Sequence, residues 1–87
     1  MSAVRRLVLS GAAPELAALR QQLDARAQYL QELRLEVALE SAALPLTVLT
    51  GLDGGVKLRE ARLVPLEEVF QMIEAMPMRR WEQQRTR

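Results

Sequence analysis

Leu33-Arg34-Leu35-Glu36-Val37-Ala38-Leu39-Glu40 is the stretch that decides the fold of this 87-residue chain. No Gly or Pro interrupts residues 15–44, so a continuous helix is one reading of it. In a strand, however, the three leucines and Val37 share one face, while the charged residues share the other. A helix over 14–44 would be about 46 Å long, against roughly 30 Å for a compact globule of this size. We therefore predict a strand at 33–40.

A long helix that dimerises as a coiled coil, followed by a β-hairpin, is the alternative that stays open. Apolar residues at positions 16, 19, 23, 30, 33 and 37 fit a heptad. Arg26 and Glu40 would then occupy core positions of the coiled coil, and charges there disfavour this seam.

The residues before this stretch predict a strand and a helix. Val4 to Leu9 is apolar and rich in β-formers, and Ser10-Gly11 ends the run. Pro14 suits a first helical position, and Glu15 complements the helix N-terminus. The helix that follows has one apolar stripe, formed by Leu16, Leu19, Leu23, Ala27 and Leu30.

The residues after it predict a hairpin and a last helix. Leu46 to Thr50 and Val56 to Val64 are the two arms, joined by the Gly-rich turn 51–55. Pro65 opens the helix and Pro77 ends it. Its apolar stripe is Leu66, Val69, Phe70, Ile73 and Met76.

The element order β-α-β-β-β-α predicts an α/β (α+β) domain with a small mixed four-stranded sheet, thioredoxin-like or ferredoxin-like. A right-handed crossover makes the first two strands parallel and places both helices on one face. If the other face is apolar, a second copy or a partner protein is its natural cover. We assign residues 1–77 to this single domain and 78–87 to a basic tail.

The composition argues against catalysis. The chain has no Cys and no His, which excludes disulfides, the usual zinc sites, thiol chemistry and imidazole acid–base catalysis. The acidic residues Glu36 and Glu40 on one strand face, and Glu67 and Glu68 at a helix start, are interpreted as solvated charges. The turn 51–55 lacks the Lys-Ser/Thr of a phosphate-binding loop. We predict no enzyme activity, catalytic residue, metal, cofactor or small-molecule ligand.

The excess of positive charge is concentrated near the C-terminus. The net charge is +1, but residues 79–87 alone carry four arginines against one glutamate. Arg suits phosphate and carboxylate groups, and Trp offers a flat anchoring surface. The predicted partner-binding residues are therefore Arg79, Arg80, Trp81, Arg85 and Arg87. A frayed, solubilising terminus is the alternative.

Several segments resemble thioredoxin-like domains. Leu44-Pro45-Leu46-Thr47-Val48-Leu49-Thr50, the Gly-rich turn, the next arm and residues 65–70 resemble the C-terminal half of that fold, where a proline precedes a hairpin and a final helix. Residues 7–14 and the Leu-rich helix are similar to its start, especially in the cysteine-poor circadian KaiB-type domains. The resemblance implies that Pro45 is the counterpart of the family's cis-proline, and that the role is protein binding.

The chain departs from that family in two ways. It lacks the CxxC motif, so redox activity is not carried over, and the linker 41–43 is too short for the family's middle helix. The sequence thus predicts a non-catalytic protein-interaction module, a small subunit, adaptor or regulator that binds a protein or forms a homodimer. The alternative is a nucleic-acid-binding accessory protein that uses the tail. No segment has the length of a membrane span, and the expected location is the cytoplasm.

Overall fold

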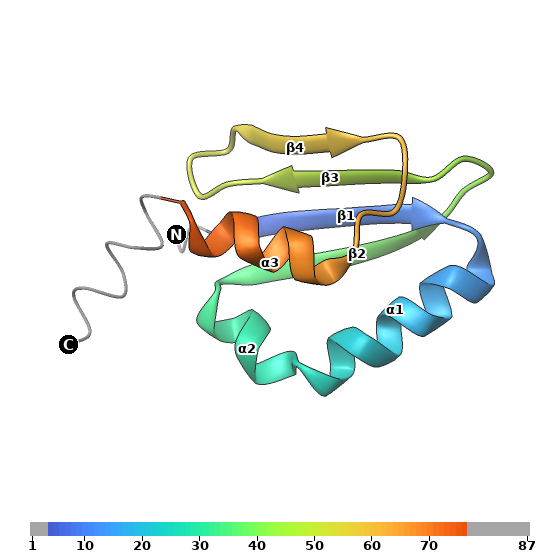
Figure 1. Ribbon diagram of the computed structural model, residues 1–87, viewed down its shortest axis with the longest axis horizontal. Helices are drawn as coiled ribbons and strands as arrows, with labels where there is room; N and C mark the ends of the chain where they lie inside the picture. Colours follow the sequence, from blue (N-terminus) through green and yellow to red (C-terminus); the bar gives the residue numbers. More distant parts are fainter. Residues whose placement is uncertain (1–3, 77–87) are drawn as a thin grey trace.

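The computed structural model describes residues 4–76 and shows a mixed α+β fold with one four-stranded sheet (Figure 1). The strands are β1 (Arg5–Gly11), β2 (Leu35–Ser41), β3 (Leu46–Thr50) and β4 (Val56–Glu60). The helices are α1 (Ala13–Ala25), α2 (Ala27–Glu32) and α3 (Leu66–Glu74). The predicted fold class is confirmed.

The strand order in the sheet is β2-β1-β3-β4. β1 pairs with β2 in parallel and with β3 antiparallel, and β4 pairs with β3 antiparallel. The crossover prediction is therefore confirmed, and the alternative of one long helix over 14–44 is wrong. A thioredoxin-like relationship stays a prediction. The peptide bond before Pro45 is trans, so this residue lacks the cis geometry that the resemblance implies.

One face of the sheet carries the core. Leu7 and Leu9 of β1 have no exposed surface, and their neighbours in the sheet register are Val37, Leu39 and Leu49. Apolar residues of all three helices join this cluster: Leu16, Leu19, Leu23, Tyr29, Leu30, Leu66, Val69, Phe70 and Ile73. The helices therefore cover the same face, as Figure 1 shows for α1 and α2 along the lower side and α3 in front of β1. The predicted apolar stripes are confirmed except at Ala27, which is exposed.

The predicted first helix is broken in two at Arg26. This residue ends α1 and begins α2, and its guanidinium lies 5.2 Å from the centre of the Tyr29 ring and 5.0 Å from that of Phe70. The two rings meet edge to face at 5.2 Å, and Arg26 also forms an ion pair with Glu67 of α3. Cation–π and aromatic contacts of this kind stabilise partly desolvated sites. These contacts hold the junction between α1 and α2 against α3.

The ends of the first two strands differ from prediction by one to two residues. β1 continues through Gly11, because backbone pairing persists to the bond from the Ala42 N–H to the Gly11 carbonyl. A Cβ at Gly11 would lie 3.1 Å from the end of the Leu63 side chain, which would have to move by a few tenths of an ångström to admit it. β2 begins at Leu35, because Leu33 caps α2 and Arg34 turns the chain with a φ of +52°.

The second hairpin arm also departs from prediction. β4 ends at Glu60 rather than Val64, and Lys57 is an extra residue between the pairs Thr50–Val56 and Leu49–Leu58. This β-bulge turns Val56 and Leu58 to opposite faces, whereas simple alternation places them on the same one. Val56 is 63% exposed as a result, while Leu58 packs against the core.

Thr47 holds the chain that leaves β4 against the sheet. Its fully buried hydroxyl donates to the Arg62 carbonyl at 2.7 Å and accepts from the Val64 N–H at 3.0 Å. Val64 is thereby kept in the core immediately before α3 begins. A single hydroxyl thus satisfies two backbone groups of the segment that leads into α3.

Replacing Thr47 by Val keeps the shape of the side chain but leaves the Arg62 carbonyl and the Val64 N–H without their bonds. We expect a loss of about 1–3 kcal/mol in the free energy of unfolding, measured by urea denaturation. The control is Thr50→Val on the half-exposed opposite face, which should change it by less than about 0.5 kcal/mol. Equal effects of the two substitutions would show that the Thr47 hydroxyl has no special role.

Candidate protein-binding surface

The face of the sheet opposite the helices has an apolar centre. Val8 of β1 lies between Ala38 of β2 and Val48 of β3 in the sheet register. Val8 and Val48 are half-buried and Ala38 is exposed. None of the elements described in residues 4–76 packs over this row. We call it the open face, with Ala38, Val8 and Val48 as its centre.

Charged residues, the polar residues Thr50 and Ser10 (the latter buried) and the apolar residues Val56 and Leu46 surround this centre. On one side Arg6 forms an ion pair with Glu36 at 3.4 Å, and Thr50 and Val56 continue that row. On the other side lie Glu40, Ser10 and Leu46, while Arg59 ends the central row at β4. An apolar centre within a polar rim is the usual organisation of a protein–protein interface.

Glu36 and Glu40 give the open face an acidic side at β2, and Arg59 gives it a basic side at β4. The two glutamates share a face, as predicted, but four residues of strand separate them by about 13 Å. Retaining and inverting glycosidases place their carboxyl pairs closer than this. The two carboxyl groups are therefore too far apart to act together as a glycosidase pair.

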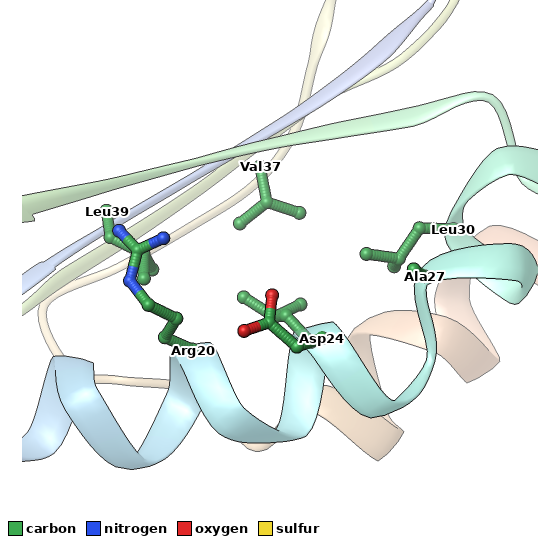
Figure 2. A pocket seen from close by; sticks show the side chains of 7 residues that line it. Arg20, Asp24, Ala27, Leu30, Val37 and Leu39 are labelled. Carbon is green, nitrogen blue, oxygen red and sulfur yellow. The ribbon is translucent and has the colours of Figure 1, made fainter.

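A groove lies on the helical side, along the β2 edge (Figure 2). It has a volume of about 240 Å³ and lies between α1, α2 and β2. The lining residues are Arg20, Leu23, Asp24, Ala27, Leu30, Val37 and Leu39. Figure 2 shows Val37 pointing into it from the strand, with the polar ends of Arg20 and Asp24 rising from α1 toward β2. The groove is smaller than most sites that bind small molecules.

The other predicted carboxylates have structural partners. Glu67 pairs with Arg26, and Glu68 pairs with Arg62 at 3.6 Å. Both glutamates lie in the first turn of α3, where acidic side chains complement the helix N-terminus. The structure therefore agrees with a solvated, structural role for this pair.

The Gly-rich segment 51–55 is a hairpin turn, as predicted. Gly54 has a φ of +82°, a conformation that glycine adopts without strain. Asp53 closes the turn by accepting from the Gly55 N–H at 2.9 Å and from the Lys57 ammonium at 3.0 Å. These two bonds, the Gly55 N–H first, hold the pKa of the Asp53 carboxyl below its ordinary value. The turn contains no phosphate cradle.

The tail residues predicted to bind a partner, Arg79, Arg80, Trp81, Arg85 and Arg87, lie outside the described residues. Within residues 4–76, no acidic cluster could hold a metal ion. Over the same range, no helix has both the length and the apolar character needed to cross a bilayer.

The sequence prediction anticipated an uncovered face and placed Glu36 and Glu40 together on one strand face, but it named none of the apolar residues at the centre of the open face. The signal was present in two runs in which neighbouring residues are apolar, Leu7-Val8-Leu9 and Val48-Leu49. Adjacent strand residues point to opposite faces, so Val8 and Val48 had to lie opposite the leucines of the core. The groove at Arg20 and Asp24 had no such signal, because its shape depends on how α1 and α2 are placed over β2.

A family model described as "Domain of unknown function (DUF4174)" matches residues 3–82. The chain belongs to this family. The matched region runs past residue 77, where we place the end of the folded domain, and includes part of the basic tail. Searches among curated proteins and among solved structures found no match.

The bonds of Asp53 predict how its carboxyl titrates. Because its pKa is lowered in the folded protein, the stabilisation it provides is present above the pKa of the unfolded chain and is lost as pH falls through the folded value. We expect Lys57→Met to raise the pKa of Asp53 only part of the way back, measured by NMR titration of the carboxyl carbon. The Gly55 N–H remains as the larger cause. Full return to the ordinary value would show that Lys57 alone lowers it.

Proposed function

We propose that this protein is a non-catalytic interaction module that binds another protein through the open face of its sheet. The observation that carries the proposal is the apolar row Ala38, Val8 and Val48 at the centre of a face that no described element covers. An apolar sheet face is normally buried against another element or a partner. Binding a partner would remove this row from water.

The charges of the rim support a specific partner. Glu36 and Glu40 at β2 and Arg59 at β4 give the face two ends of opposite sign. Such a pattern fixes the orientation of a complementary surface and disfavours wrong partners. We therefore expect the partner to present an apolar patch with basic groups on one side and an acidic group on the other.

Two finer points belong to the same proposal. The compartment we propose is the cytoplasm, where a chain without cysteines needs no oxidising environment to fold. The alternative function is nucleic-acid binding through Arg79, Arg80, Trp81, Arg85 and Arg87, which the basic and aromatic character of the tail supports.

The test uses the full chain as bait for proteins of its own host. Wild type is compared with the double variant Val8→Lys/Val48→Lys, which places two charges in the centre of the open face. We expect wild type to retain one or a few proteins, and the double variant to lose them at least tenfold by quantitative mass spectrometry. The matched control is Gln21→Lys/Gln28→Lys, two exposed helix positions that receive the same charge.

Circular dichroism and urea unfolding establish that all variants are folded. If the control and the open-face variant lose the same proteins, the open face is not the binding surface and the proposal fails. Salt-sensitive retention on DNA or RNA, abolished by ending the chain at Pro77, would favour the alternative.

A further inference from the structure

The two edges of the sheet differ in how well they are protected from pairing. β4 has five residues, a bulge at Lys57 and exposed charges at Lys57 and Arg59. Natural proteins use short strands, bulges and charges of this kind to block edge-to-edge pairing. β2 has seven residues and pairs only with β1 among the described strands, in an unbroken register with no proline and no bulge.

The backbone groups that β2 presents at its free side follow from its ladder with β1. The Arg5 N–H donates to the Arg34 carbonyl at 2.7 Å, and the Ala42 N–H donates to the Gly11 carbonyl at 2.9 Å. The N–H and C=O of one residue in a parallel strand point to the same side, so the even-numbered residues of β2 face β1. Leu35, Val37 and Leu39 therefore direct their N–H and C=O groups outward.

From this edge we infer that the protein forms a two-fold dimer in which β2 pairs antiparallel with β2 of a second copy, centred on Val37. The inference concerns the edge of the sheet rather than its open face, so it stands or falls separately from the proposed function.

The charges of β2 favour pairing with a second copy of the chain in one particular register. With the two-fold axis at Ala38, Glu36 of each copy would lie opposite Glu40 of the other, and like charges across a ladder are destabilising. With the axis at Val37, Glu36 lies opposite Ala38, and Glu40 comes beside Arg34, the residue before the strand. The second register therefore replaces two repulsions by two attractions.

Apolar contacts favour the same register. On the helical face Val37 lies opposite its own copy, and Leu35 lies opposite Leu39. Val37 and Leu39 are half-exposed because the groove of Figure 2 opens beside them. Pairing would cover these side chains and join the two sheets into one of eight strands.

Single cysteine substitutions test the register without interference from other thiols, because the chain contains no cysteine. With the axis at Val37, the Cα atoms of residue 37 in the two copies are about 5.5 Å apart, within the range for a disulfide. Those of residue 38 are about 8 Å apart, beyond that range. We expect V37C to cross-link under mild oxidation and A38C to stay uncross-linked at the same protein concentration.

The opposite result would overturn the register, and a dimer that neither variant cross-links would overturn the β2 interface. Size exclusion with light scattering on the unmodified full chain provides the direct test of association. A monomer at all concentrations up to about 1 mM would overturn the dimer.

Charge exchange gives an independent readout in the cysteine-free protein. We expect Glu40→Arg alone and Arg34→Glu alone each to raise the dimer dissociation constant by about tenfold or more, since each creates two like-charged pairs. The double variant should restore it to within about threefold of wild type. Single variants that dimerise as wild type does, or a double variant that does not recover, would contradict the pairing of Glu40 with Arg34.

Discussion

The short connection between β2 and β3 is the constraint on which the rest of this structure depends. Four residues, 42–45, join the end of one strand to the start of the next, and both strands flank β1. So short a link provides no chain to cross over the sheet and cover its second face. All three helices lie on the other face, and the apolar residues Val8 and Val48 stay partly accessible. This connection is too short to hide the surface that we propose for binding.

The covered face solves a different problem, which is how a chain with one Tyr, one Trp and one Phe builds a stable core. Leucines supply most of the buried area, and the few aromatic contacts are concentrated where elements meet. Arg26 illustrates this economy, because its side chain touches both Tyr29 and Phe70 and also pairs with Glu67. One long polar side chain thereby joins the α1–α2 junction to α3, with its apolar stem packed and its charge near the surface.

The sequence predicted the elements well where the hydrophobic periodicity agreed with the Gly and Pro residues that mark the ends of elements. β3 at 46–50 and the buried stripe of α3 follow directly from alternation, Pro65 and the spacing of four apolar residues. The failures occur where tertiary contacts decide. Neither Gly nor Pro marks the break at Arg26, and nothing in the run 56–64 marks Lys57 as an extra residue. Arg5 reads as an exposed basic residue, yet it is fully buried and its guanidinium donates to the Leu33 carbonyl. For the site, adjacent apolar residues within a strand indicated a second apolar face of the sheet. The outward direction of the backbone groups of β2 could be known only from its hydrogen bonds with β1.

The bulge at Lys57 has a consequence for the size of any assembly this chain forms through its sheet. A sheet whose two edge strands can both pair with another copy adds copies at both ends, and such open-ended growth leads to fibres. Here the extra residue twists one edge away from flat pairing and places a cation on it. In the dimer that we infer, β4 forms both outer edges of the joined sheet. Its bulge therefore favours a closed assembly over an open-ended one.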